Sequence, residues 1–157
     1  MELKAIEDIE APIDVVFRVV SDFEAFERAA LRRGAGVSRV NRDGDQIFLI
    51  SWDIKAKIRG KKRMLKTDLT QFNAPNTLCV VTRIGGLQGD TDIELVALSR
   101  TRTRLSIHTE LKANSLSARL LLQTARLAKG RLEKRYKLQC AKFAEDIETR
   151  YKAGQLS

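Results

Sequence analysis

The spacing of hydrophobic residues changes along the chain and predicts successive regions of different secondary structure. Residues 2–10 alternate loosely between apolar and polar side chains, which predicts a strand. Residues 12–20 and 23–31 repeat apolar side chains at helical spacing, with Pro12 suited to a first helical turn and Asp22 suited to cap the second helix. The period then falls to two over residues 37–113 and becomes helical again from Leu116 towards Tyr151.

The central region predicts about six consecutive antiparallel strands. Its clearest strand runs from Phe48 to Ile58, where every second side chain is apolar and charged side chains occupy most of the positions between, so one face is buried and the other is wet. Asp43-Gly44 before it is a hairpin turn signal. The faces of residues 61–72 stay undecided, because Leu65 and Leu69 compete with Met64 and Phe72. Turns at 74–76, 85–86 and 99–101 separate the later strands.

The last region predicts one long helix with an apolar stripe. At 100° per residue, one face of this helix carries Leu122, Ala125, Lys129, Leu132, Tyr136, Cys140, Phe143 and Ile147. An unbroken helix of this length would measure about 50 Å, so we expect a bend near Gly130 or a projecting end.

The order of these elements predicts the fold class. A long antiparallel meander with one apolar face must bury that face, and only the closing helix is large enough to cover it. We therefore expect an α+β helix-grip fold, in which a curved antiparallel sheet of about seven strands wraps around a long C-terminal helix and two short helices follow the first strand. Residues 1–157 are expected to form a single domain.

Several short segments and this layout together resemble the START/Bet v 1-like superfamily, and more narrowly its bacterial polyketide cyclase/dehydrase and lipid-transport group. The segments that carry the resemblance are Ile9-Glu10-Ala11-Pro12, Val15-Val16-Phe17, Ser21-Asp22-Phe23-Glu24, Trp52 and Thr103-Arg104-Leu105. The chain departs from the family pattern where Arg100-Thr101-Arg102 replaces a usual glycine, and where no tryptophan or proline follows the second helix's Asp-Phe-Glu. The resemblance implies a deep, mostly apolar cavity for a lipid, sterol, polyketide or quinone, and it implies no shared catalytic residue.

The buried strand faces and the helix stripe supply the predicted cavity wall. We expect a hydrophobic ligand to contact Phe48, Ile50, Trp52, Ile54, Ile93, Leu95, Leu105, Ile107, Thr109, Leu122, Ala125, Lys129, Leu132 and Tyr136. The simpler alternative is that these side chains fill the interior and leave no cavity.

Lys129 and Tyr136 are the two polar residues that we expect to orient the ligand. An ammonium on the apolar stripe must snorkel, pair with an acid such as Glu7, or meet the acidic head of a ligand. The Tyr136 hydroxyl could donate to a ligand carbonyl or be satisfied at the edge of the core.

The residue types that metal and nucleophilic chemistry require are scarce. His108 is the only histidine and, like Asp53, has outward strand parity. Cys79 and Cys140 lie far apart without a CxxC pair, and no phosphate-binding glycine loop is present. We therefore expect neither a metal nor another cofactor. An aromatase/cyclase-like enzyme remains an alternative that would have to use Glu7, Lys129 and Tyr136.

The charge of the chain is uneven and bears on its partners. Lys and Arg number 29 against 20 Asp and Glu, which gives a net charge of +9. Residues 1–31 carry a net charge of −5 and residues 32–157 carry +14. A basic face of this kind fits an acidic membrane or rRNA, although a solvated surface is the simpler interpretation. Aromatic residues make up only 6% of the chain, so we expect no sequence-specific nucleic-acid binding.

Taken together, these features favour a cytoplasmic protein that binds or transports a hydrophobic small molecule or lipid in an internal cavity. The two free thiols fit a reducing compartment, and the first residues do not form a signal peptide. The alternatives are the cyclase-like enzyme and a basic adaptor that docks to the ribosome or an acidic membrane.

Overall fold

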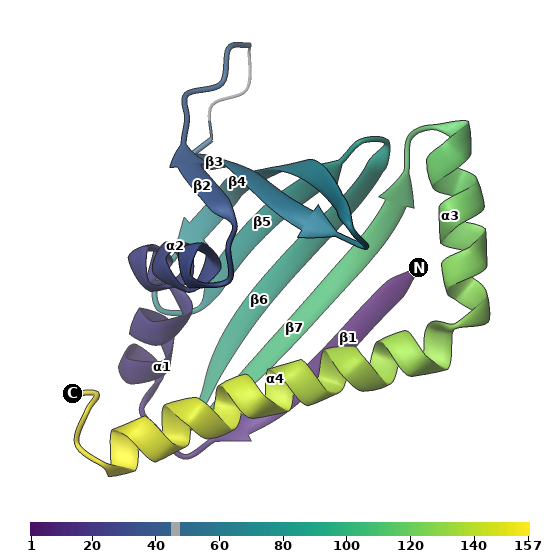
Figure 1. Cartoon of the computed structure of the whole chain (residues 1–157). Coiled ribbons are helices and arrows are strands. Elements are labelled where there is room, and N and C mark those ends of the chain that lie inside the picture. The colour runs from purple at the N-terminus through teal and green to yellow at the C-terminus, as the bar shows by residue number, and fades with distance from the viewer. Residues whose placement is uncertain (45–47) are drawn as a thin grey trace.

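The computed structural model describes residues 1–44 and 48–157 (Figure 1). Strand β1 (Glu2–Ile9) leads into two short helices, α1 (Ile13–Val20) and α2 (Phe23–Arg32). The strands that follow are β2 (Gly36–Arg39), β3 (Ile50–Ile58), β4 (Lys61–Asn73), β5 (Thr77–Ile84), β6 (Leu87–Ser99) and β7 (Arg102–Ala113). Helices α3 (Leu116–Leu127) and α4 (Lys129–Lys152) close the chain.

The described strands form a seven-stranded antiparallel sheet in the order β1-β7-β6-β5-β4-β3-β2. Consecutive strands from β2 to β7 are neighbours, and β1 completes the sheet by pairing with β7. Helix α4 packs on one face of the sheet, mainly along β1 (Figure 1). We call this the inner face and the opposite one the outer face. The predicted α+β helix-grip fold is confirmed.

The strand boundaries differ from the sequence prediction at two places. Strand β3 begins at Ile50, so Phe48 precedes the strand and its predicted place in the alternating pattern is wrong. The turn that Asp43-Gly44 predicts runs into residues 45–47, which lie outside the described residues.

A β-bulge explains why the faces of β4 could not be assigned from the sequence. The register with β5 shifts between Leu69 and Gln71. Leu69 packs beside Trp52, and Phe72, which the pattern placed on the other face, packs against Phe17 with ring centroids 5.3 Å apart. The extra residue therefore lets Leu69 and Phe72 share the inner face despite their odd spacing.

The closing helix is divided at Ala128. The N–H of this residue donates to the Ala125 carbonyl at 3.0 Å, and its backbone leaves the helical region. The bend expected near Gly130 is thus confirmed two residues earlier. Helix α3, capped by the Ser115 hydroxyl at 3.2 Å from the Ala118 nitrogen, stands at the end of the sheet instead of crossing it (Figure 1).

Two clusters of buried side chains form the core. The first, which we call the α4 cluster, comprises Ile9, Ala11, Val15, Val16, Phe17, Val20, Leu95, Leu105, Ala144 and Ile147. The second, the Trp52 cluster, comprises Trp52, Leu69 and Leu78. Ile93 packs against both.

The motif residues near β7 hold the start of the chain in place. The fully buried Thr103 hydroxyl donates to the Ala11 carbonyl at 2.8 Å. Arg104 makes two bonds to the Asp8 carboxylate across the β1–β7 pair, at 2.8 and 3.1 Å. These contacts explain why a threonine and an arginine suit these positions.

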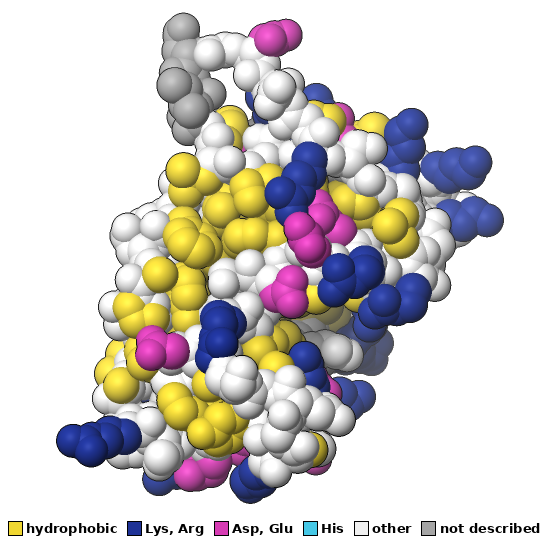
Figure 2. Space-filling model, turned by 90° about the vertical axis from the view of Figure 1, so that its left-hand side faces the viewer, with side chains coloured by type: hydrophobic (Ala, Val, Ile, Leu, Met, Phe, Trp, Pro, Cys, Tyr) yellow, Lys and Arg dark blue, Asp and Glu magenta, His cyan; other side chains and the backbone are white. Residues whose placement is uncertain are grey.

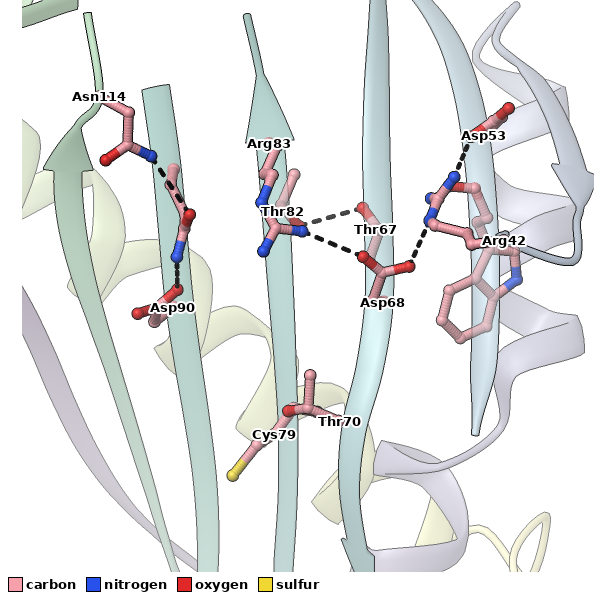
Figure 3. A network of polar contacts seen from close by, with 12 residues as sticks. Arg42, Asp53, Thr67, Asp68, Thr70, Cys79, Thr82, Arg83, Asp90 and Asn114 are labelled. Atoms are coloured by element: carbon pink, nitrogen blue, oxygen red, sulfur yellow. Dashed lines mark hydrogen bonds and ion pairs between the residues drawn. The ribbon is translucent and has the colours of Figure 1, made fainter. Parts of the chain in front are cut away.

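The outer face is held by a network of charged side chains (Figure 3). The Asp68 carboxylate is fully buried and accepts from Arg42 at 2.6 Å and from Arg83 at 3.2 Å. Arg42 also bonds Asp53 at 2.9 Å and the Trp52 carbonyl at 2.9 Å. Because a buried carboxylate needs such partners, this network ties the segment after β2 to the sheet.

The turn between β3 and β4 consists of two residues. Ile58 pairs with Lys61, and between them Arg59 and Gly60 both have positive φ angles, of 51° and 78°. This is the backbone of a tight hairpin turn, which asparagine and glycine adopt most readily.

Candidate functional site

An apolar pocket of about 380 Å³ lies between the α4 cluster and the Trp52 cluster. We call it the main pocket. Its wall combines the last residue of α1, α2, the inner faces of six strands and one side chain of α4. The lining residues are Val20, Phe23, Phe26, Glu27, Ala30, Val37, Trp52, Ile54, Thr67, Leu78, Val80, Ile93, Leu105, Ile107 and Phe143.

The polar groups on this wall are satisfied by hydrogen bonds within the protein. Glu27 accepts the Trp52 indole N–H at 2.8 Å and two bonds from Arg39 at 2.7 and 3.1 Å. The Arg39 hydrogen bond lowers the pKa of Glu27, and the Trp52 bond acts in the same direction. The Thr67 hydroxyl shares a bond of 3.0 Å with Thr82. A ligand therefore meets apolar surface and polar groups that already have partners.

Aromatic side chains close the wall towards α2. The Phe23 ring lies 5.5 Å from that of Trp52, and the Phe26 ring lies 6.2 Å from that of Phe143. Phe26 and Phe143 also line a surface groove beside α1, so this ring pair separates the main pocket from that groove. Figure 2 views the α1–α2 side and shows hydrophobic side chains reaching the surface there in patches.

A second apolar pocket of about 400 Å³ adjoins the main one beside the first turns of α4. We call it the Tyr136 pocket, and it is lined by Leu3, Ile107, Leu132, Arg135, Tyr136, Gln139, Cys140 and Phe143. Ile107 and Phe143 belong to both walls. The inner face therefore offers one apolar path from the start of α4 to the main pocket.

The structure brings some of the predicted wall residues together and disperses others. The main pocket contains Trp52, Ile54, Ile93, Leu105 and Ile107. Leu132 and Tyr136 lie in the Tyr136 pocket, where the Tyr136 hydroxyl shares a bond of 2.9 Å with Thr109. Leu95 is buried in the α4 cluster, and Ile50 packs against the Trp52 cluster.

Phe48 and the residues predicted from α3 lie elsewhere. Phe48 lines a polar depression with Arg39 and Arg42. Leu122 is buried and Ala125 half-buried on α3, away from both pockets. Their predicted place on the cavity wall is wrong, because it assumed a helix that crosses the sheet without a break.

Of the alternatives for Lys129, the structure shows pairing with an acid, but the partner is Glu133 and not Glu7. The break at Ala128 rotates α4 relative to α3, and the Lys129 side chain is 53% exposed, with its Nζ 3.6 Å from Glu133 on the same helix. Glu7 is half-buried and lies near Cys140. Burial raises the pKa of the Cys140 thiol, and the negative charge of Glu7 raises this pKa further by a smaller amount. The expected Lys129–Glu7 pair is therefore not formed.

The wall residues that were not predicted include Phe23, Phe26 and Glu27 on α2 and Phe143 on α4. A signal existed for three of these four, since Phe23 and Phe26 share a helical face and Phe143 lies on the apolar stripe. Glu27 had none, because a glutamate on a short helix is ordinarily a solvated side chain.

The described residues assemble neither a metal site nor an activated nucleophile. His108 lies on the outer face, as predicted, with Nε2 3.4 Å from Glu2 and Nδ1 3.8 Å from Asp92. Burial, and then the neighbouring Asp92, raises the pKa of the Cys79 thiol to about 11, so it is protonated at neutral pH. No group of three potential ligand side chains converges within the described ranges.

Comparison with known proteins identifies the fold. No protein-family model matches the chain, and no curated protein matches it. The chain does resemble solved structures. The Zhui aromatase/cyclase from Streptomyces sp. R1128 superposes with a TM-score of 0.64 at 11% identity, covering 96% of this chain and 95% of its own.

Two further solved structures have a similar fold. TTHA0849 from Thermus thermophilus has a TM-score of 0.61 at 17% identity and covers 98% of this chain and 99% of its own. A START superfamily protein from Mycobacterium smegmatis has a TM-score of 0.54 at 15% identity and covers 86% and 96%.

The sheet, the closing helix and the apolar pocket define a helix-grip protein. Its fold is shared with the aromatase/cyclase and with the START superfamily protein described above. In the part of the chain that the structure describes, no helix has both the length and the apolar composition to cross a membrane.

Proposed function

We propose that this protein binds one uncharged hydrophobic small molecule in the main pocket. The observation that carries the proposal is a pocket of about 380 Å³ whose described wall contains no cation and no unpaired polar side chain. Burial of about 200 Å² of apolar ligand surface there would contribute roughly 5 kcal/mol. A polyketide, a quinone or a sterol-like lipid fits this requirement, and carriage of such a molecule is the corresponding role.

The pocket favours a neutral ligand over an acidic one. The wall's charged group is the Glu27 carboxylate, which repels anions, and its Arg39 partner is occupied. Transfer of an ionised ligand from water to such a site would leave its charge unpaired, which is costly.

A cyclase-like reaction has less support from the side chains. Lys129 lines neither pocket and pairs with Glu133, Tyr136 bonds Thr109, and Glu27 is held by Arg39 and Trp52. The wall described here thus lacks an acid and a base that converge on one point.

The protein carries its own reporter for a binding experiment. Trp52 is the single tryptophan and lines the pocket. We expect N-phenyl-1-naphthylamine, which is neutral, to quench Trp52 emission in a saturable titration. Its matched sulfonate, 8-anilino-1-naphthalenesulfonate, should bind at least about tenfold more weakly, because its charge gains no partner. Equal affinities for the two probes would contradict the proposal.

A pair of neighbouring substitutions locates the binding. Val80 lines the main pocket, and Val81 follows it on the outer face of β5. Val80→Phe should fill the pocket and weaken the binding of N-phenyl-1-naphthylamine by about tenfold or more, whereas Val81→Phe should leave it unchanged. Native mass spectrometry before and after organic extraction would then identify a ligand that co-purifies.

A further inference from the structure

Helix α3 is apolar on both of its sides. Ala118 and Leu122 are buried towards the sheet. On the opposite side Leu116, Leu120 and Leu127 are exposed by 73%, 57% and 91%, and at 100° per residue they fall within about 40° of one another. An ordinary surface helix is polar on its outer side, so this leucine stripe requires a partner.

Cations without acidic partners surround the stripe. Residues 111–132 contain five Lys and Arg and no Asp or Glu. Among the described residues, Arg119, Arg126 and Arg131 have no carboxylate within ion-pair distance, whereas Lys112 and Lys129 do.

The β3–β4 hairpin supplies a second block of positive charge. Residues 54–67 contain seven Lys and Arg and no Asp or Glu, and within the described ranges none of the seven forms an ion pair. The basic residues of this block are Lys55, Lys57, Arg59, Lys61, Lys62, Arg63 and Lys66.

The chain path places both features at one end of the sheet. Strands β4 and β6 begin at this end, β3, β5 and β7 end there, and α3 follows β7 directly (Figure 1). The hairpin also projects, because β4 pairs with β5 only from Lys66 onwards. The leucine stripe and the hairpin cations thus lie at the same end of the molecule, where one partner surface could contact both.

We infer that this end of the molecule docks on an anionic lipid bilayer, with the leucine stripe in the interface and the hairpin cations on the headgroups. Exposed leucines flanked by arginines, with no acid among them, are the composition of an interfacial helix. RNA would use the cations but leave the leucines in water. A second copy of this chain would bring its own unpaired cations against these, which disfavours self-association through this end.

This docking surface is distinct from the main pocket and does not depend on the proposed ligand. It lies next to the start of α4, where the Tyr136 pocket begins. A molecule leaving the bilayer would therefore meet the apolar path along the inner face first. Vesicle binding is measured without any ligand, so its failure and that of ligand binding are separate results.

The test is co-sedimentation with vesicles of phosphatidylcholine alone and with about 30% phosphatidylglycerol. We expect binding only to the anionic vesicles and release by about 0.5 M NaCl. Leu120→Ser with Leu127→Ser should weaken binding by about tenfold or more. Lys61→Gln with Lys62→Gln and Arg63→Gln should weaken it by a similar factor.

Matched controls separate this surface from general effects. Leu31→Ser with Leu138→Ser removes leucines exposed by 54% and 53% elsewhere, and Lys137→Gln with Lys142→Gln and Lys152→Gln removes three exposed cations of α4. Both controls should bind as the unchanged protein does, and circular dichroism should show all variants folded.

Three results would overturn the inference. The first is binding by the α3 leucine variant that equals that of its control. The second is an absence of vesicle binding together with rRNA binding that does not need the leucines. The third is a dimer, detected by light scattering, that the leucine substitutions dissociate.

Discussion

At the scale of single residues, Glu27 shows how a carboxylate can belong to an apolar wall. It receives the Trp52 indole N–H and the two Arg39 bonds, so its charge is compensated within the protein. The group fixes the position of the Trp52 ring, which itself forms part of the wall. Glu27 thus positions the wall and leaves no free charge for a ligand.

The lowered pKa of Glu27 predicts a dependence of stability on pH. Because folding lowers this pKa below the ordinary value of 4.5, the ionised form stabilises the fold above that value, and the contribution is lost as the pH falls through the lowered pKa. We expect Glu27→Gln to be less stable than the unchanged protein at pH 7. Thermal unfolding from pH 7 to pH 3 should show this gap narrowing below about pH 4.5.

Comparison with Glu24→Gln isolates the effect. Glu24 is exposed on the same helix, and the other carboxylates with lowered pKa values, Asp8 and Asp90, are present in all three proteins. The Glu24→Gln protein should follow the unchanged one across the range. A Glu27→Gln gap that stays constant from pH 7 to pH 3 would argue against an ionised Glu27 as the source.

Sequence reasoning could place Trp52, Ile54, Ile93, Leu105 and Ile107 on the wall, because strand parity alone decides which face a side chain occupies. It could not place Glu27 on the wall, since the position of this side chain depends on how α2 packs against the sheet. It misplaced Lys129, since helical periodicity holds only while the helix is unbroken.

At the scale of elements, the position of α3 depends on a close contact with the β5–β6 turn. Gly86 lies against the side chain of Ser115, the residue that caps α3, and its carbonyl accepts the Asn114 N–H at 2.7 Å. A side chain at residue 86 has no room unless Ser115 moves. The glycine therefore permits the turn and the helix start to meet.

Gly86→Ala should consequently disturb the start of α3. The added methyl group would displace the cap, and we expect a loss of about 1–3 kcal/mol in the free energy of unfolding. Hydrogen exchange should rise in residues 115–122. Gly89→Ala is the control, because its Cβ would meet Leu111 at an ordinary 3.5 Å. Unchanged exchange in α3 of the Gly86→Ala protein would refute this account.

The helices and strands themselves were largely predictable, but the irregularities within them, a β-bulge and a helix break, were not. Alternation and turn residues were enough to identify the meander from β3 to β7. The bulge at Leu69/Gln71 changes parity without a change in composition, so the faces of β4 stayed undecided. The break at Ala128 occurs at a good helix former, which offers no local signal.

At the scale of the whole molecule, the main pocket lies between the two clusters that form the core. Ile93 contacts both clusters and also lines the pocket. A molecule in the pocket would therefore touch side chains of each cluster and join them. Ligand binding and global stability should then be coupled.

This coupling predicts a ligand-dependent melting temperature. At a concentration of N-phenyl-1-naphthylamine about 100-fold above its dissociation constant, the linkage contributes about 2.7 kcal/mol. For a chain of 157 residues this corresponds to a rise of roughly 5–10 °C in Tm. Far-ultraviolet circular dichroism measures it. The Val80→Phe protein should show no rise, and an equal rise in both proteins would mean that the probe binds outside the pocket.

Arg59, at the tip of the β3–β4 hairpin, illustrates a conflict between stability and function. Its φ of 51° suits glycine or asparagine, and a larger side chain there costs the fold roughly 1 kcal/mol. The same position carries a cation at the most projecting point of the proposed bilayer surface. Selection for thermostability alone would therefore favour replacing this arginine. The resulting protein would be more stable but would bind anionic membranes less tightly.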